Sequence, residues 1–557
     1  MIQKTIQDSI KKALIKAQKK KELSLFKIPP VIVSRPTEKK FGDWTTNIAL
    51  TLSSQIKKPP SEIASIIIEN IPSKNLFSEI NEKNGFINFT LSPSYYQSVL
   101  AQILKESNKF GQLNLGQGKK VQVEFGSANP TGPLHIAFGR NLFLGDTLAR
   151  ILEKAGFRVQ REYYVNDLGN QIEIFARSVE LRYLELLGQK IKFPQDGYQG
   201  DYPILLAKKI KEKYRDKFLK QKPLERLTRF KKLVIPLVIK DAQHVCRQAN
   251  IKFDRWFRES ELYQRNIFTQ VLKILERKKL VYKKDLALWF KTSSFGEKKD
   301  DVVIRADGTP TYFGSDIAYH YHKFEKRKFD RVVDVWGADN SGNVARLKKA
   351  MAALGFKDKL EIVIYQYVKI LEKGEIVDVS KRKGIYITLE EVINKVGPDA
   401  ARFFLLLRSP NSHLVFDLDL AVSTSEKNPV YYIQYAYARI CSILKKLNYS
   451  QTKIIKKNRV SNLKLELLTH PSEIELMKNL VLLPEIITEI VHDYYLIHKL
   501  PFYAYDLANA FHHFYDSCRV IVSDTEIKNA RLALILATKV VLKNTLDLLG
   551  ISAPCKM

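Results

Sequence analysis

Residues 121–140 read VQVEFGSANPTGPLHIAFGR, and this stretch decides the fold. Its first five residues alternate and are rich in Val, which predicts a β-strand. A Gly- and Pro-rich loop follows, and then a helix is predicted from about Leu134 to Lys154. The next strand is predicted at Arg158 to Val165. Strand, helix and strand form the βαβ unit of a doubly wound parallel sheet, so we expect an α/β fold.

The loop between this strand and this helix is a candidate phosphate site. Free N–H groups and the positive end of the helix dipole meet at a helix N-terminus. Open α/β sheets bind their ligands at the carboxyl edge of the strands. Pro133 suits the first helical turn, and His135 would point from that turn toward a bound anion. An ordinary turn with a surface histidine would show the same local pattern, so both interpretations stay open here.

Three regions separate along the 557 residues, a length too great for one hydrophobic core. Residues 1–115 show the mixed pattern of a small α+β domain. Residues 116–425 hold the α/β domain, interrupted by a charged helical insertion at about 173–279. Residues 426–557 are helical throughout, which predicts an all-α bundle. Later strands are predicted at Val302 to Ile304, Arg331 to Val335 and Leu360 to Ile364.

The composition excludes several classes of protein. Apolar residues make up 45% and charged residues 27%, as in a soluble globular protein. No apolar run is long enough for a bilayer span, and the Lys-rich start of the chain shows no secretory signal. The four cysteines form no CxxC pair, which argues against a disulfide framework or a zinc site and favours a reducing cytoplasm. These are Cys246, Cys441, Cys518 and Cys555.

The net charge of +32 is less ordinary. A charge of that size attracts polyanions, and nucleic acid above all. A general drift toward Lys in an AT-rich genome would also raise the charge and leave only solvated faces. Composition therefore leaves a nucleic-acid-binding protein and a very basic enzyme open. The basic helical insertion is likewise either a surface for nucleic acid or a solvated face.

The segment EFGSANPTGPLH at 124–135 resembles the HIGH-motif segment of bacterial arginyl-tRNA synthetases, a family of class I aminoacyl-tRNA synthetases. Further segments resemble this family in order along nearly the whole chain, so the chain is identified as a member of it. They are GDWTTN at 42–47, EYYVNDLGNQ at 162–171, DGT at 307–309, WGAD at 336–339, the KMSKS-like SKR at 380–382, PDAARFF at 398–404 and NPVYYIQYA at 428–436.

The resemblance implies a fold and an activity. The α/β domain is expected to be a Rossmann-like, HUP-type catalytic domain, flanked by an N-terminal tRNA-recognition domain and a C-terminal anticodon-binding bundle. The implied reaction joins L-arginine to the 3′ end of tRNA(Arg) through an arginyl-adenylate, with ATP and Mg²⁺. Members of the family are mostly monomeric, and a cytoplasmic location without membrane association is expected. No metal site made of protein side chains is predicted.

The resemblance also implies roles for single residues. His135, Lys381 and Arg382 are the catalytic candidates, because cations near the phosphates stabilise charge that develops on pyrophosphate. Carboxylates suit a guanidinium substrate, and Tyr312 and Asp316 share one helical face. The predicted arginine-binding residues are Glu124, Ser127, Asn129, Tyr312, Asp316 and Asn340. The predicted ATP-binding residues are Asn129, Pro130, Thr131, Gly132, Pro133, Leu134, His135, Ala137, Phe138, Gly337, Asp339, Asn340, Val379, Ser380 and Lys381.

The predicted tRNA-binding residues lie at the start of the helical bundle. They alternate aromatic and cationic groups, as the bases of a single-stranded anticodon require for stacking. Core packing is the alternative for each tyrosine. The residues are Tyr431, Gln434, Tyr435 and Arg439.

Several positions depart from the family pattern. The usual His-x-Gly-His is here His135-Ile136-Ala137-Phe138, so a methyl group replaces Gly where the backbone should approach adenine. A phenyl ring replaces the second His, and loss of one such contact costs about 2.7–4 kcal/mol. Asn340 also stands where the family usually has His. A rival hypothesis is therefore a catalytically weakened paralogue that mainly binds tRNA, and a nucleotidyl transferase with another substrate is a third.

Overall fold

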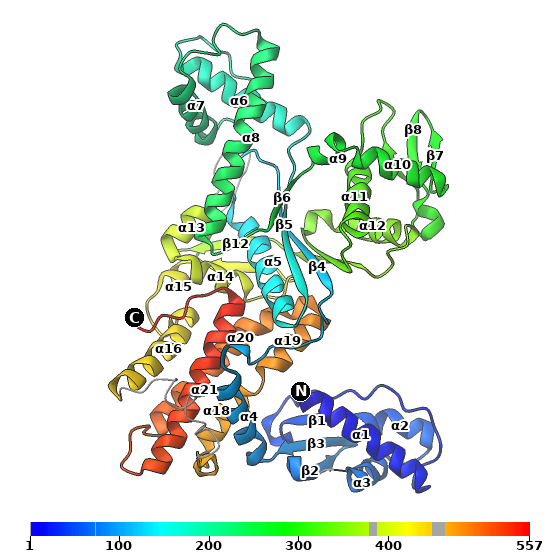
Figure 1. The fold of residues 1–557 in the computed structure, drawn as a ribbon, viewed down its shortest axis with the longest axis vertical. Helices are drawn as coiled ribbons and strands as arrows, with labels where there is room; N and C mark the ends of the chain where they lie inside the picture. Colours follow the sequence, from blue (N-terminus) through cyan, green and yellow to red (C-terminus); the bar gives the residue numbers. More distant parts are fainter. Residues whose placement is uncertain (1, 73, 378–386, 448–462) are drawn as a thin grey trace.

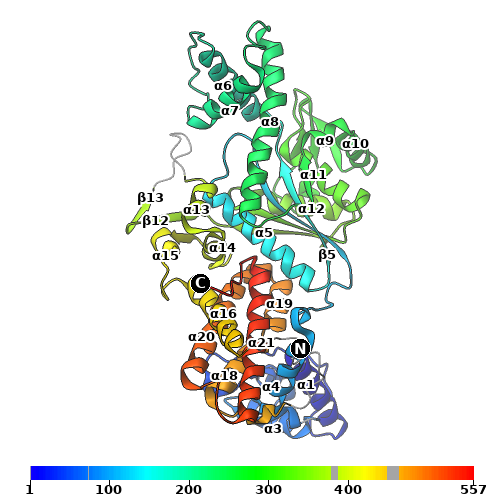
Figure 2. The ribbon, with the colours of Figure 1, turned by 60° about the vertical axis from the view of Figure 1, so that its left-hand side comes forward.

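The computed structural model describes residues 2–72, 74–377, 387–447 and 463–557. Figure 1 shows a central α/β part with a helical arm at one end and, at the other end, a helical bundle beside a small N-terminal unit. The same order of parts is visible in Figure 2. The predicted architecture of a parallel-sheet domain, a small α+β unit and a C-terminal bundle is confirmed.

The N-terminal unit is a three-stranded antiparallel sheet with β3 in the centre, covered by helices. Helix α1 packs on α3, and both α2 and α3 pack on the sheet. A long helix, α4, leads from this unit into the rest of the molecule and packs on the C-terminal bundle. The elements are α1 (Ile2–Lys19), β1 (Trp44–Thr46), α2 (Ile48–Ile56), α3 (Pro60–Asn70), β2 (Phe77–Lys83), β3 (Phe86–Leu91) and α4 (Pro93–Glu106).

The central sheet has five parallel strands in the order β11-β10-β4-β5-β6. The chain order reverses between β4 and β10, which makes the sheet doubly wound. Helix α5 covers one face, and α11 and α12 belong to the core on the other face. The elements are β4 (Lys120–Ala128), α5 (Ile136–Lys154), β5 (Arg158–Val165), β6 (Arg255–Arg258), α11 (Tyr312–Tyr321), β10 (Arg331–Gly337), α12 (Ser341–Ala353) and β11 (Leu360–Tyr365).

The insertion differs from the prediction of one helical segment over 173–279. Helices α6, α7 and α8 form an arm with a hydrophobic core of its own (Figure 2). The chain then returns to the sheet as β6, which pairs with β5. Four residues that include two arginines show too little apolar alternation to be recognised as a strand. The elements are α6 (Asn170–Leu186), α7 (Asp201–Tyr214), α8 (Pro223–Gln248), α9 (Ser260–Gln264) and α10 (Ile267–Arg277).

A second correction concerns the strand predicted at Val302 to Ile304. The strand exists as β9 (Asp301–Ile304), but it lies in a separate antiparallel sheet with β7 (Val281–Lys284) and β8 (Ala287–Phe290). The sequence pattern of a short apolar strand does not reveal its partner, because pairing depends on contacts between distant segments.

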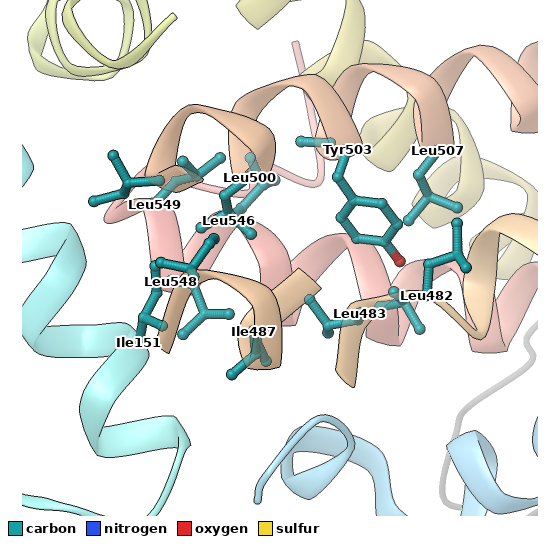
Figure 3. Close-up of a cluster of buried hydrophobic side chains, with 14 of the residues drawn as sticks. Ile151, Leu482, Leu483, Ile487, Leu500, Tyr503, Leu507, Leu546, Leu548 and Leu549 are labelled. Carbon is teal, nitrogen blue, oxygen red and sulfur yellow. The ribbon is translucent and has the colours of Figure 1, made fainter. Parts of the chain in front are cut away.

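The C-terminal part begins with a small sheet of β12, β13 and β14 and continues as the helical bundle. Figure 3 shows how the bundle packs: Ile151 of α5 lies among leucines of α19, α20 and α21. The elements are β12 (Val368–Glu372), β13 (Glu375–Val377), α13 (Leu389–Val396), α14 (Pro398–Leu406), β14 (Leu414–Asp417), α15 (Leu418–Val422), α16 (Pro429–Lys446), α18 (Pro471–Leu480), α19 (Leu483–His492), α20 (Lys499–Ser517) and α21 (Thr525–Leu549).

A buried arginine joins the α/β part to this bundle. Arg402 of α14 is 1% exposed, and its Nη1 lies 2.7 Å from Oδ2 of Asp146 on α5. The same guanidinium donates to the carbonyl oxygens of Leu549 at 3.1 Å and Ala249 at 2.9 Å. One side chain therefore ties together α5, the end of α8 and the end of α21.

The cysteines correct one interpretation. Cys441 of α16 and Cys555 near the chain end form a disulfide, although the scattered cysteines argued against a disulfide framework. The two are 114 residues apart, and only the packing of the last residues against α16 brings them together. Cys246 and Cys518 are free and buried. Across the described ranges of the chain, no helix is both long and apolar enough to cross a membrane.

Candidate active site

A cavity of about 1260 Å³ opens over the carboxyl ends of β4, β5 and β10. It includes the point where the strand order reverses, which is the usual ligand position in such sheets. Pro130 is buried and does not line the cavity. The four predicted residues Val379, Ser380, Lys381 and Arg382 lie outside the described residues. The predicted residues that line the cavity are Glu124, Ser127, Asn129, Thr131, Gly132, Pro133, Leu134, His135, Ala137, Phe138, Tyr312, Asp316, Gly337, Asp339 and Asn340.

The loop after β4 is shaped by one glycine and one asparagine. Gly126 has a φ of +81°, and a Cβ at this position would lie 2.5 Å from the Tyr163 ring, so a larger residue would not fit. Its N–H donates to Oδ1 of Asn141 on α5 at 2.5 Å. The Nδ2 of Asn141 donates to the carbonyl of Val335 on β10 at 2.6 Å. These bonds hold the loop, the helix and the neighbouring strand in one arrangement.

Helix α5 starts two residues later than predicted. His135 is its N-cap, and Nδ1 of His135 accepts a hydrogen bond from the N–H of Phe138 at 3.2 Å. Pro133 therefore lies in the loop before the helix and not in its first turn. The loop also pairs with the segment after residue 386, since the N–H of Leu389 donates to the carbonyl of Leu134 at 2.7 Å.

Two of the departures from the family pattern lie at the cavity wall. Ala137 is half-buried and lines the cavity. The Phe138 side chain is 7% exposed, and its ring centroid lies 6.3 Å from that of Tyr163 and 6.2 Å from that of His135. Phe138 thus joins an aromatic cluster, since Tyr163 stacks on Trp256 at 4.1 Å. Phe138 therefore contributes apolar packing to this cluster, and a histidine at the same position would make the cluster less apolar.

Two further carboxyl groups, those of Asp316 and Glu259, line the same cavity. Asp316 of α11 is half-buried and lines the cavity, and Tyr312 stands one turn earlier at its exposed rim. Burial raises the pKa of Asp316 to about 7. Burial, followed by the charges of Asp316 and Asp167, also raises the pKa of Glu259 to about 7. Two carboxyl groups poised near neutrality face one cavity, which suits a cationic ligand.

Sequence reasoning missed Glu259. It directly follows β6, so it lies at the carboxyl edge of the sheet beside the cavity. Its position directly after a strand could have marked Glu259 as a site residue, but the sequence pattern did not show that β6 is a strand. The role of Glu124 also looks different in the structure. Its carboxylate is buried and paired with the ammonium group of Lys323, another residue that the sequence did not single out.

The remaining predicted ligand residues are distributed around the cavity. Nδ2 of Asn129 donates to Oε1 of Gln171 at the start of α6, 2.5 Å away, so the loop contacts the helical arm. Asn340 is exposed at the N-terminus of α12, and Ser127 is exposed at the end of β4. Both side chains can reach a ligand without displacing a core contact.

Three of the four predicted tRNA-binding residues, Tyr431, Tyr435 and Arg439, form a stacked ladder on α16 that Tyr515 of α20 extends. The rings of Tyr431 and Tyr435 are parallel within 8°, with centroids 6.1 Å apart. The guanidinium of Arg439 lies 4.6 Å from the Tyr435 ring and 4.4 Å from the Tyr515 ring. Gln434 instead donates to Asp399 at 2.9 Å and to Ser552, and so tethers α16 to α14 and to the chain end.

The sheet, the cavity at its switch point and the bundle behind it define a class I aminoacyl-tRNA synthetase. A family model described as "tRNA synthetases class I (R), catalytic domain" matches residues 99–405. Models of the "Arginyl tRNA synthetase N terminal domain" and the "DALR anticodon binding domain" match residues 4–91 and 433–557. The chain belongs to the arginyl-tRNA synthetase family.

Individual relatives agree with this membership. The chain is 43% identical to an arginine–tRNA ligase of Desulfitobacterium hafniense, over 100% of this chain and 99% of that protein. It is 44% identical to one of Caldanaerobacter subterraneus over 99% and 98%. A putative arginyl-tRNA synthetase structure from Campylobacter jejuni shares 32% identity with a TM-score of 0.76, over 84% of this chain and all of that one. The Thermus thermophilus arginyl-tRNA synthetase, at 22% identity, shares the fold over both full lengths with a TM-score of 0.77.

Proposed function

We infer that this protein is an arginine–tRNA ligase, which uses ATP to join L-arginine to tRNA(Arg). The observation that carries this function is the acidic side of the cavity, where Asp316 and Glu259 face a loop and helix N-terminus suited to phosphate. A guanidinium and a triphosphate would meet in this one cavity. The alternative of a paralogue that mainly binds tRNA is not favoured, because the full-length relatives are arginine–tRNA ligases.

The proposed roles follow from charge and position. Asp316 and Glu259 receive the guanidinium group, and Glu124 and Asn129 hold the amino-acid end. Tyr312 closes the rim, while Ser127 and Asn340 complete the arginine contacts. Charged hydrogen bonds of this kind are about twice as strong as neutral ones, which gives arginine its advantage over uncharged amino acids.

ATP is proposed to lie over the loop from Asn129 to Phe138, with Gly337, Asp339 and Asn340 opposite. His135 at the start of α5 and the helix dipole face the phosphates. Lys381 and Arg382 are proposed to neutralise pyrophosphate. Mg²⁺ is proposed to enter with the nucleotide, since this ion is usually held by substrate phosphates and one or two carboxylates.

The domains are proposed to divide the work, with boundaries near residues 115 and 425. Residues 1–115 and 426–557 contact tRNA, and residues 116–425 carry the reaction. The insertion, from α6 to α8, is proposed to end before β6. We further propose that the protein acts as a monomer in the cytoplasm.

The direct test is pyrophosphate exchange in the presence of ATP, tRNA and one amino acid at a time. We expect exchange with arginine and with no other amino acid of the twenty. Retained tRNA binding without exchange for any amino acid would instead establish the paralogue. A nucleotidyl transferase with another substrate would show ATP consumption that does not depend on arginine.

A pH dependence follows from the carboxyl groups that face the guanidinium. Both pKa values are raised to about 7, and only the ionised forms attract arginine. We therefore expect kcat/KM for arginine to be constant above about pH 8 and to fall below pH 7, by up to about a hundredfold per unit where both groups must ionise. The measurement is kcat/KM for arginine from pH 5.5 to 9. E259Q should make the fall shallower, and a flat wild-type profile between pH 6 and 8 would contradict the assignment.

Phe138→His tests whether the apolar ring lowers the rate. A histidine restores a donor beside the phosphates, and we expect kcat to rise by about tenfold, a part of the roughly 10²–10³ that one such donor contributes. Loss of apolar packing on Tyr163 should lower Tm by a few degrees. An unchanged kcat with a folded variant would show that the cavity compensates for Phe138 elsewhere. F157H, at a half-buried ring far from the cavity lining, is the control for the substitution itself.

Tyr435→Ala tests the stacked ladder on α16. Removing this ring takes the stacking partner from both Tyr431 and Arg439. We expect KM for tRNA to rise about tenfold, since one stacked base contributes about 1–3 kcal/mol. KM for arginine and ATP should not change. Y505A removes a half-exposed tyrosine on α20 outside the ladder and serves as the matched control. Equal effects of the two variants would show that the ladder does not contact tRNA.

A further inference from the structure

A lysine that is buried completely lies beneath the cavity. Lys323 has an exposed fraction of 0%, and its ammonium group pairs with Oε2 of Glu124 and with Oδ1 of Asp334 at 3.2 Å. The same ammonium lies 4.1 Å from the centre of the Tyr319 ring. Lysines are almost never fully buried unless their charge is paired, and here two carboxylates supply that pairing.

Lys323 lies in an unusual backbone turn at the end of α11. Helix α11 carries Tyr312 and Asp316 and is followed directly by a π-helical turn at His322–Lys326. π-Helical turns are rare, and they occur often at functional sites. The turn holds Lys323, whose ammonium group reaches Glu124 of β4 and Asp334 of β10.

The pairing extends as a continuous buried chain of contacts between two cavity walls. Nε2 of His320 lies 2.6 Å from Oδ2 of Asp334, and Nδ1 of His320 lies 2.7 Å from the backbone oxygen of Asp316. From the backbone oxygen of Asp316 the contacts therefore run through the side chains of His320, Asp334 and Lys323 to Glu124. It joins the helix proposed to hold the guanidinium to the strand proposed to hold the amino-acid end.

The charge states are consistent with this arrangement. Burial by itself would lower the pKa of Lys323, but the carboxylates of Asp334 and Glu124 outweigh it and raise that pKa, so the lysine is cationic. Burial raises the pKa of Glu124, and Lys323 opposes that rise. Without the ammonium group, the pKa of Glu124 would rise further, and its carboxyl group would lose charge toward the cavity more readily.

We propose that Lys323 is a positioning residue for arginine, which acts through Glu124. Its ammonium holds one oxygen of Glu124, and the structure gives the other oxygen, Oε1, no hydrogen-bond partner among the described residues. That oxygen is available to a cationic group in the cavity. Through Asp334 and His320, Lys323 also ties Glu124 of β4 to the backbone of α11, the helix that carries Asp316. The inference rests on arginine as the substrate proposed above.

The test replaces Lys323 by Met, which keeps the length and removes the charge. We expect the Kd for arginine at pH 7, measured by calorimetry on the full chain, to rise about tenfold or more, because loss of a cation within contact distance moves a carboxyl pKa by about 1–3 units. The Kd for ATP should stay within about twofold. The arginine affinity of K323M, relative to the wild type at the same pH, should recover in part as the pH is raised, because a higher pH favours the ionised form of Glu124. A purely structural role would not produce this recovery.

Two further variants control for effects other than the charge of Lys323. K326M, on the same turn but exposed, is the matched control and should behave as the wild type. A double-mutant cycle with E124Q should show that K323M has little further effect once Glu124 is neutral. The groups that interact with Glu124 are Asp316, Tyr319, His320, Lys323 and Arg327 from α11 and its π-turn, Asp334 from β10 and Tyr164 from β5.

The outcomes separate the possibilities. Equal arginine affinity in K323M and the wild type, or full additivity with E124Q, would overturn the proposal. If K323M does not fold, D334N answers the same question, since it removes an anchor of Lys323 and leaves the lysine in place. A several-fold rise in the arginine Kd of D334N supports the proposal, and an unchanged Kd overturns it. Because calorimetry reports binding without turnover, a wild type that binds arginine but charges no tRNA would refute the proposed function alone.

Discussion

Replacement of Asp316 by Asn should lower kcat/KM for arginine by about 10³-fold. Loss of one partner from a desolvated charge pair costs about 2–5 kcal/mol, and each 1.4 kcal/mol is a factor of ten. Asn keeps the size and shape of the side chain, so the loss reports the missing charge. The measurement is tRNA- and arginine-dependent pyrophosphate exchange, with arginine varied at saturating ATP.

The same variant should remain folded and should still bind ATP and tRNA. Since the pKa of Asp316 is raised to about 7, the protein already holds this group partly neutral at pH 7 when no substrate is bound. Exchange of the acid for an amide therefore costs little stability. E325Q on the adjacent π-turn changes a carboxylate that pairs only with surface Lys328, and it should keep wild-type kinetics. Retention of a third of the activity by D316N would refute the role of Asp316.

Replacement of Arg402 by Met should destabilise the protein by about 3–5 kcal/mol. Met fills much of the volume but leaves the carbonyl oxygens of Ala249 and Leu549 without a donor in a dry interior. Asp146 keeps Arg150 at 2.8 Å, so part of its charge stays compensated. The expected result is a clear fall in the midpoint of urea unfolding and a looser joint between the α/β part and the bundle.

A surface arginine provides the comparison for Arg402. R265M removes an ion pair with Glu261 from a side chain that is 62% exposed, and exposed pairs contribute about 0–1 kcal/mol. Limited proteolysis at low enzyme ratio should cut R402M between α14 and α21 and leave R265M intact. Equal unfolding midpoints for the two variants would show that Arg402 does not hold the joint.

Local chain pattern predicted much of the fold correctly. The βαβ unit was predicted from the strand at residue 121, the Gly- and Pro-rich loop and the helix that follows. Such a prediction is possible because alternation and helical spacing are properties of residues close together in the sequence. His135 was found from the local pattern of the loop, whereas Tyr312 and Asp316 were expected from the family resemblance, which their i, i+4 spacing supports. The structure brings these residues to one cavity.

Long-range partners were beyond such reasoning. The strand β6 is too short and too charged to show a pattern, so Glu259 at its end went unnoticed. The pairing of β9 with β8, and the disulfide between Cys441 and Cys555, each depend on segments brought together by the packed chain. A buried ion pair leaves no trace in the local pattern, because Lys323 looks like any other lysine in a basic protein.

The sequence by itself determined the lineage, the doubly wound sheet and the loop proposed to hold phosphate, since each depends on the pattern of neighbouring residues. Only the tertiary structure decided how the charges are arranged around that loop. Folding buries Lys323 against Glu124 and Asp334. It also raises the pKa values of Asp316 and Glu259 to about 7 and packs the Phe138 ring near Tyr163. The physical reason is that burial and the distance between charges set these properties, and both exist only once distant parts of the chain have packed together.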